Sequence, residues 1–274
     1  MNYILGSSGL LGTAIIRELD EQSSIVVPRN EYENWIKPDR IRTFLRENQV
    51  NASDSFYVCS GVTDPNSNRN LLQLHNCDIP LSVLKESIKR DYRVITFGSI
   101  QENFSVLNNY IDSKKKFLKE STTIGGLPNH VHFQMHTIYG IHMPKNYMLL
   151  GLVLEAIRSN SRLKMTSGKQ FREYWHATDV ARFVVSEDWN SNPDRITPIS
   201  SGHPLRIKDL VTAIFDKFSL SGLLSLGSLS DDPNEAYTFD MFTPSIAARY
   251  MRDPVHGVHE YLESCLTGAF NERQ

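Results

Sequence analysis

The chain of 274 residues has few cysteines, no long apolar run and no large excess of either charge. Its three cysteines, Cys59, Cys77 and Cys265, are odd in number and form no C-x-x-C pair, which argues against a disulfide framework or a zinc site. No stretch approaches the roughly 18 apolar residues of a membrane span. The first predicted strand begins next to the N-terminus, which leaves no room for a signal peptide. We therefore expect a cytoplasmic protein without a bound metal and without a membrane partner.

The charge balance also limits the partners. Lys and Arg total 29 and Asp and Glu total 31, which gives a net charge of −2. Because there is no basic excess, a nucleic acid is not expected as a partner. No proline-, glycine- or serine-rich tract separates two independent halves, and no internal repeat is present. We expect one compact body.

Strand and helix signals alternate through most of the first 200 residues. This alternation predicts an α/β fold, a Rossmann-type doubly wound parallel sheet with helices on both faces. The predicted strands are 3–5, 24–27, 55–59, 93–97 and 130–135. The predicted helices are 10–19, 38–48, 68–89 and 110–121.

The rhythm changes in the second half of the chain. The patterns there predict helices over 147–158, 177–189 and 207–218, a short β segment over 171–175, and a loop-rich remainder. We therefore predict a dinucleotide-binding domain over 1–160, to which a segment near 177–200 returns, and a small C-terminal substrate-binding lobe over 161–274.

A glycine motif follows the first predicted strand. Its glycines are three residues apart, in the segment Gly6-Ser7-Ser8-Gly9-Leu10-Leu11-Gly12. Such glycines allow a tight turn out of the strand, close approach of the backbone to a pyrophosphate, and tight packing of the helix on the strand. The position between a strand and an apolar-periodic helix predicts a dinucleotide site in which Gly6, Ser8, Gly9, Leu10, Leu11 and Gly12 contact the cofactor.

The end of the second predicted strand indicates which dinucleotide binds. An NAD site generally offers a carboxylate there, whereas a guanidinium matches the 2′-phosphate of NADP. This chain has Arg29 at that end, with Glu31 two residues later. Arg29 favours NADP(H), and a solvated loop arginine remains the alternative. Further cofactor contacts are expected from Ser60, Gly61, Val62 and Asn76.

A second pattern carries the chemistry of a nicotinamide-dependent enzyme. Tyr110 and Lys114 are one helical turn apart and follow Ser99, which ends an apolar strand. A tyrosine with the ordinary pKa of about 10 is a poor proton donor at neutral pH unless a neighbouring group lowers that pKa, as the charge of a lysine does. We predict that Ser99, Tyr110 and Lys114 are catalytic, and that Tyr110 and Lys114 also contact the cofactor.

These segments resemble the extended short-chain dehydrogenase/reductases that act on nucleotide sugars. The resemblance covers residues 1 to about 215 and includes two later segments, His136-Thr137-Ile138-Tyr139-Gly140 and Phe171-Arg172-Glu173-Tyr174-Trp175-His176-Ala177-Thr178-Asp179-Val180. It implies that Arg172 binds the diphosphate of a nucleotide sugar. It also implies substrate contacts by Ser99, Gln101, His136 and Tyr139, and leaves a homodimer as an option.

The loop between Ser99 and Tyr110 is shorter than in most of these enzymes. That loop and the segment 164–174 look most like the CDP-paratose and CDP-abequose synthases. The resemblance implies NADPH-dependent reduction of the 4-keto group of a nucleotide-activated 6-deoxy or 3,6-dideoxy hexulose, in deoxysugar biosynthesis for a surface polysaccharide such as the lipopolysaccharide O-antigen.

Other activities of the same family fit the residues less well. Sugar 4,6-dehydratases place an Asp-Glu pair directly after the hydroxyl residue, whereas Ile100 and Gln101 follow Ser99 here, although Glu102 is close. Enzymes that epimerise carbons 3 and 5 carry a cysteine in place of Gln101. A 4-epimerase with bound NAD and a non-catalytic NADP(H)-sensing protein remain the alternatives, and Arg29 and the intact catalytic set disfavour them.

Overall fold

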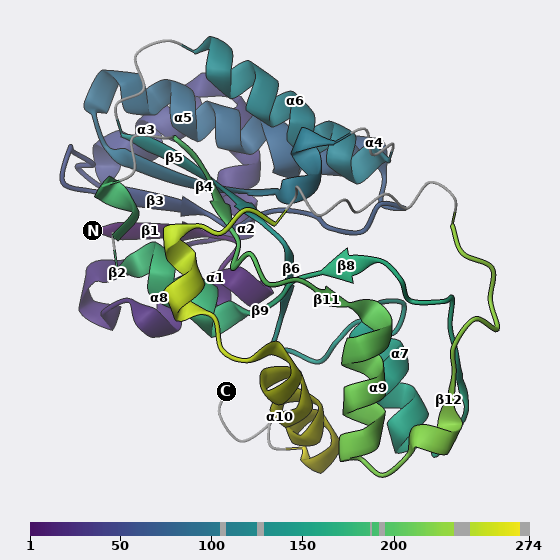
Figure 1. Ribbon diagram of the computed structural model, residues 1–274. Coiled ribbons are helices and arrows are strands. Elements are labelled where there is room, and N and C mark those ends of the chain that lie inside the picture. Colours follow the sequence, from purple (N-terminus) through teal and green to yellow (C-terminus); the bar gives the residue numbers. More distant parts are fainter. Residues whose placement is uncertain (105–107, 125–128, 187, 192–194, 233–241, 269–274) are drawn as a thin grey trace. The chain divides into compact units, whose positions relative to one another are not determined.

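The computed structural model describes all residues except 105–107, 125–128, 187, 192–194, 233–241 and 269–274 (Figure 1). The chain forms two compact units, residues 1–135 with 184–198, and residues 136–183 with 199–274. The predicted boundary at residue 160 therefore moves to 135, and the returning segment shortens to 184–198. The physical reason is that helix α7 (Leu149–Arg158) buries its apolar face in the core of the second unit.

The first unit contains the predicted doubly wound sheet. Its six strands lie in the order β10-β5-β4-β3-β1-β2, and the pairs from β5 to β2 are all parallel. The strands are β1 (Asn2–Leu5), β2 (Ser24–Val27), β3 (Ser55–Val58), β4 (Arg93–Ser99), β5 (His130–Met135) and β10 (Ile196–Ile199). The predicted Rossmann-type fold class is confirmed.

Helices cover this sheet. They are α1 (Leu10–Glu18), α2 (Arg29–Tyr32), α3 (Pro38–Glu47), α4 (Arg69–Gln73), α5 (Ile79–Arg90) and α6 (Asn109–Thr123). In Figure 1, α3, α5 and α6 lie on one face of the sheet and α1 lies on the other. Alternate residues of the strands point their side chains to the first face. Tyr3 and Phe56 are buried there together with Trp35 and Tyr92. The sheet is therefore anchored by an aromatic core.

The single helix predicted over 68–89 is interrupted by a π-helical turn. The turn comprises Leu74–Asp78 and separates α4 from α5. Pro80 lies at the start of α5 and has no N–H to donate to the carbonyl four residues earlier, which favours a wider turn at this point. The turn carries His75 and Asn76, both buried.

The register of the strands brings three strand ends together. Leu5 at the end of β1 is paired with Val27 on β2 and Val58 on β3. The chain leaves β1 for β2 on one side and later returns to β3 on the other, so the order of strands reverses beside β1. Ligands of such sheets bind outside the carboxyl ends at this reversal, where Gly6, Arg29 and Ser60 follow the strands.

The second unit is built from helices and two-stranded sheets. Its elements are β6 (Thr137–Tyr139), α7, β7 (Leu163–Lys164), β8 (Phe171–Arg172), β9 (Tyr174–His176), most of α8 (Ala177–Val185), β11 (Leu205–Arg206), α9 (Ile207–Lys217), β12 (Leu224–Ser225) and α10 (Pro254–Thr267). The strands pair as β11-β8, β12-β7 and β6-β9. Helices α7, α9 and α10 pack together around an apolar core.

Helix α10 corrects the prediction that the C-terminal part is loop-rich. The signals were present in the sequence. Asp253 caps the helix by accepting a hydrogen bond from the N–H of His256, and Pro254 occupies the first turn. Val258, Leu262 and neighbouring apolar residues recur at helical spacing.

A membrane-spanning helix is not found in the part of the chain that the structure describes, because no helix there combines the necessary length and hydrophobicity.

Candidate active site

The turn between β1 and α1 contains two glycines at positions where the fold leaves no space for a side chain. Gly6 has a φ of +78°, and a Cβ on it would lie 2.6 Å from backbone atoms of Cys59 and Ser60. A Cβ on Gly12 would lie 2.2 Å from the carbonyl oxygen of Gly6. Any side chain at either position would therefore force the turn away from β3 or from α1.

Gly9 has a different environment. Its backbone is extended, with φ −78°, and the one neighbour that a Cβ would approach is the Gly6 oxygen at 3.3 Å. Gly9 is the N-cap of α1, makes no side-chain cap, and no acidic residue occupies the first turn. The first N–H groups of α1 therefore receive no cap from the Gly9 side and no acidic neighbour in the first turn, which suits an anion such as a pyrophosphate.

The end of β3 adds a polar atom to the same region. The hydroxyl oxygen of Ser60 is buried and has no hydrogen-bond partner. A buried polar atom without a partner is costly unless a ligand supplies one. The Gly9 turn, the start of α1 and Ser60 therefore fit a dinucleotide.

Arg29 is held by two neighbours. Its Nε donates to Glu33 Oε1 at 2.7 Å, and its Nη2 lies 3.1 Å from His75 Nε2. Glu33 Oε1 also lies 3.1 Å from that His75 nitrogen. The hydrogen bond from Arg29 holds the pKa of Glu33 below its usual value. Glu31, the carboxylate closest in sequence, instead accepts a hydrogen bond from Trp35 Nε1.

Asn76 fixes the loop that follows β3. Its Oδ1 accepts from the Val62 N–H at 2.9 Å, and its Nδ2 donates to the Val62 carbonyl and to the Ser113 hydroxyl. The π-helical turn thus ties the segment Ser60 to Val62 to helix α6. The Asn76 amide thus makes three hydrogen bonds within the protein, and its contact with the cofactor stays a prediction.

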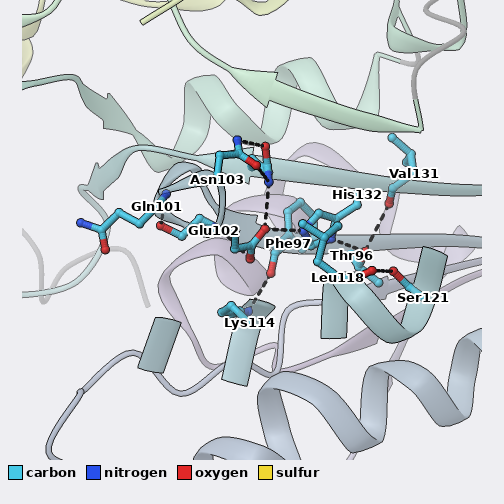
Figure 2. A network of polar contacts seen from close by, with 12 residues as sticks. Thr96, Phe97, Gln101, Glu102, Asn103, Lys114, Leu118, Ser121, Val131 and His132 are labelled. Carbon is cyan, nitrogen blue, oxygen red and sulfur yellow. Dashed lines mark hydrogen bonds and ion pairs between the residues drawn. The ribbon is translucent and has the colours of Figure 1, made fainter. Parts of the chain in front are cut away.

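Lys114 lies buried between strand ends. Its Nζ donates to the Phe97 carbonyl at 2.7 Å, and a Cβ on Gly61 would approach that Nζ to 3.3 Å (Figure 2). Burial lowers the pKa of Lys114 from its usual value. Asn108 caps α6 by accepting a hydrogen bond from the Ile111 N–H, so that half-buried Tyr110 lies in the first turn and Lys114 in the next.

Ser99 is the last residue of β4 and begins a capping box with Glu102. The Ser99 hydroxyl accepts a hydrogen bond from the Gln101 N–H, and Glu102 Oε1 accepts one from the Ser99 N–H at 3.0 Å. The Gln101 side chain points away from the Glu102 carboxylate (Figure 2). The structure therefore brings Ser99 and Lys114 to the same end of β4.

Sequence reasoning missed the polar cluster behind Ser99. His132 Nε2 and Gln134 Nε2 both lie 3.0 Å from Glu102 Oε2, and Thr96 Oγ1 contacts His132 Nδ1 at 2.8 Å and His130 Nε2 at 2.9 Å. His130, His132 and Gln134 alternate along β5 and so share one face. That alternation, opposite Thr96 on the predicted neighbouring strand, was the available signal.

In the second unit, His136 and Tyr139 each carry a buried polar atom without a hydrogen-bond partner. These atoms are His136 Nε2 and the Tyr139 hydroxyl oxygen. Burial lowers the pKa of His136 to about 4, and the ring stacks on Phe242 with centroids 5.0 Å apart. Both residues therefore remain candidates for ligand contact.

Arg172 lies beside a cavity of the second unit. Its Nη1 donates to the carbonyl of Phe171, and its strand β8 pairs with β11. The cavity has a volume of about 290 Å³ and a mostly apolar lining, in which Lys164, Gln170 and Arg172 carry long polar side chains. The complete lining comprises Leu149, Leu152, Leu163, Lys164, Met165, Thr166, Gln170, Arg172, Tyr174, Ile207 and Leu229. An apolar pocket with two cationic side chains suits a nucleobase joined to phosphate.

Within the described residues, no group of three or more His, Cys, Asp or Glu side chains could hold a metal ion. All three cysteines are free.

No protein-family model and no curated protein matches the sequence. Solved structures of nucleotide-sugar enzymes do match the fold. A dTDP-4-dehydrorhamnose reductase from Clostridium acetobutylicum is 14% identical with a TM-score of 0.74, over 96% of this chain and 99% of that chain. A GDP-mannoheptose C4 reductase from Campylobacter jejuni, with NADP bound, is 15% identical with a TM-score of 0.72, over 96% and 97%. A dTDP-glucose 4,6-dehydratase from Bacillus anthracis, in complex with NAD, is 12% identical with a TM-score of 0.72, over 96% of each chain.

These matches extend over almost the whole of this chain and of each solved structure. They confirm, at the level of the fold, the resemblance predicted from the sequence. The chain has the fold of the nucleotide-sugar reductases and dehydratases.

Proposed function

We propose that this protein uses NADPH to reduce the 4-keto group of a nucleotide-activated 6-deoxy or 3,6-dideoxy hexulose, in deoxysugar biosynthesis. The observation that carries the proposal is the end of β4: Ser99 is its last residue, and buried Lys114 donates to the Phe97 carbonyl and lies near Gly61, in the segment that follows β3. The shared fold with nucleotide-sugar reductases supports it.

The chain's own residues divide the chemical work. Gly9, the start of α1 and Ser60 hold the dinucleotide, which supplies a hydride for carbon 4 when bound. Ser99 donates a hydrogen bond to the oxygen on carbon 4. Tyr110 gives its phenol proton to the same oxygen as negative charge develops on it. The Lys114 cation favours loss of that proton because it stabilises the phenolate that remains.

The second unit, taken by itself, contains residues that suit a nucleoside diphosphate. Arg172 pairs with the diphosphate, since a guanidinium binds phosphate oxygens in a bidentate manner. The adjacent apolar cavity takes the nucleobase. Thr166, Gln170 and Tyr174 are the uncharged side chains in its lining that can both donate and accept hydrogen bonds.

Incubation with a 4-keto nucleotide sugar tests the proposal. We expect stoichiometric loss of NADPH absorbance at about 340 nm and a product about two mass units heavier by mass spectrometry. Tyr110→Phe should lower turnover by about 10²–10⁴-fold and leave NADPH affinity nearly unchanged, because it removes the proton donor alone. An isomer of unchanged mass, formed without loss of NADPH, would refute the reductase activity.

One observation favours a second candidate, a 4-epimerase that keeps bound NAD. The Glu33 carboxylate lies beside Arg29, and a carboxylate at this position is typical of ribose recognition in NAD sites. The dehydratase reaction gains no support, because Glu102 is fully buried and both its oxygens accept hydrogen bonds from the protein. The same incubation separates the candidates, since an epimerase yields an isomer.

A further inference from the structure

The carboxylate of Glu102 is buried directly behind the proposed catalytic serine. Its side chain is 0% exposed. Oε1 accepts from the Ser99 N–H at 3.0 Å, and Oε2 accepts from His132 and from Gln134, each at 3.0 Å (Figure 2). Three donors on one carboxylate favour its ionised form.

Neighbouring strands hold this carboxylate rigidly. A carboxylate only accepts hydrogen bonds, so the proton shared with His132 lies on Nε2, and the other ring nitrogen is held by Thr96 Oγ1. Gly98 leaves the space for the pair, because a Cβ there would lie 2.3 Å from both Glu102 Oε1 and His132 Nε2. These contacts hold the Glu102 carboxylate in place. Through its hydrogen bond with the Ser99 N–H, the carboxylate in turn holds the backbone of Ser99 in position.

A buried Lys114 stays protonated more readily when an anion lies near its ammonium group. Burial lowers the pKa of Lys114, and its hydrogen-bond partner, the Phe97 carbonyl, is neutral. Glu102 and Cys59 are the groups that raise the pKa of Lys114 again. Desolvation raises the pKa of the Cys59 thiol far above its usual value, so this group stays neutral. Tyr110, one turn earlier on α6, carries no charge while its phenol is protonated. Glu102 is the negative charge near Lys114: the Lys114 ammonium donates to the carbonyl of Phe97, and the Glu102 carboxylate lies against Gly98, the next residue of β4.

We propose that Glu102 is a positioning residue for the reaction: its buried carboxylate orients Ser99 through the backbone and supplies the negative charge that keeps Lys114 protonated. This inference rests on the proposed function for its catalytic meaning. The electrostatic part concerns the protein alone.

The protonation of Lys114 can be measured without substrate. In the full-length protein labelled with ¹³C at the lysine Cε, the Lys114 signal is assigned by its loss in Lys114→Arg, and its pH titration is followed by NMR. We expect Glu102→Gln to lower the Lys114 midpoint by about one pH unit, because a nearby negative charge raises the proton affinity of its neighbours. Glu102→Met removes the same charge if the amide is not tolerated beside two N–H donors.

A matched control is available in the same unit. Glu86 is also buried, on α5, and pairs with Arg42 at 3.0 Å. Glu86→Gln should leave the Lys114 midpoint and turnover as in the wild type. Equal Lys114 midpoints in Glu102→Gln, Glu102→Met and wild type would overturn the proposal.

Kinetics separate charge from position. Glu102→Asp keeps the charge but shortens the reach to the Ser99 N–H, so kcat should fall while the Lys114 midpoint stays near the wild-type value. In Glu102→Gln the alkaline limb of kcat/KM should move to lower pH, whereas a purely structural defect would lower the whole profile without moving the limb. If the wild-type protein reduces no 4-keto sugar but the midpoint still falls in Glu102→Gln, the proposed function fails and the electrostatic role of Glu102 stands.

Discussion

At the scale of single residues, the proposed choice of cofactor depends on two opposite charges one helical turn apart. The Arg29 side chain is 62% exposed and Glu33 is 33% exposed, so both can reach a ligand. A 2′-phosphate attracts Arg29 and repels Glu33. Ribose hydroxyls, by contrast, can accept a hydrogen bond from Arg29 or donate one to Glu33. We therefore expect the difference between these two contacts to set the preference between NADPH and NADH.

Substitution of each partner should move this preference in opposite directions. Arg29→Asp should cost about 1.5–3 kcal/mol of the preference for NADPH, the scale of a charge-assisted hydrogen bond. Glu33→Gln should increase the preference, because it removes the repulsion and frees the guanidinium. Fluorescence titration of each variant with both cofactors measures the two effects. Equal NADPH and NADH affinities in the wild type would remove Arg29 from the cofactor site.

At the scale of elements, the turn between β1 and α1 contains two kinds of glycine. Gly6 and Gly12 are required by close packing, whereas Gly9 leaves room for a ligand. Gly12 is pressed against the Gly6 carbonyl, whereas Gly9 faces open space at the helix start. The same residue type thus serves tight packing at one position and leaves space at another.

This difference predicts two distinct phenotypes. Gly12→Ala should lower the free energy of unfolding by about 2–4 kcal/mol, because its Cβ would overlap backbone that has no space to move. Gly9→Ala should change it by less than about 1 kcal/mol yet weaken NADPH binding, since the added methyl enters the space of the pyrophosphate. Urea unfolding and cofactor titration on both variants give the comparison. A normal NADPH affinity in folded Gly9→Ala would place the pyrophosphate elsewhere.

At the scale of the whole molecule, both units contain buried or half-buried histidines that remain neutral. Burial lowers the pKa of His130 in the first unit to about 3, and the pKa values of His136 and His176 in the second unit to about 4. In the unfolded chain a histidine titrates near pH 6.5. Below that pH the unfolded state binds more protons than the folded state, so stability must fall as the pH falls toward about 4.

We therefore expect the melting temperature to decrease steadily from pH 7 to pH 5, before most carboxylates titrate. Each pKa unit of difference is worth about 1.4 kcal/mol per histidine once the pH is below both values. His130→Gln should flatten the decrease, because its amide can donate to Thr96 without taking up a proton. Differential scanning fluorimetry across this range measures the slope. A melting temperature that is constant between pH 7 and pH 5 would contradict the burial of these rings in their neutral form.

The sequence by itself determined the local features of this protein. Period-2 and period-3.6 apolar patterns specified the parallel sheet and most helices, and the strand–glycine–helix order specified the turn at Gly6, Gly9 and Gly12, because these depend on neighbours along the chain. Helix α10 was equally readable from its Asp253 cap and apolar spacing. The spacing of Tyr110 and Lys114 on one helix belongs to the same class.

Only the tertiary structure decided which side chains meet. Arg29 and Glu33, which follow β2, both meet His75 on the turn between α4 and α5. The Asn76 amide bonds Val62 and Ser113, and Glu102 turns inward to His132. Each of these contacts joins residues on different parts of the fold. Such choices depend on strand register and burial, which no local pattern encodes.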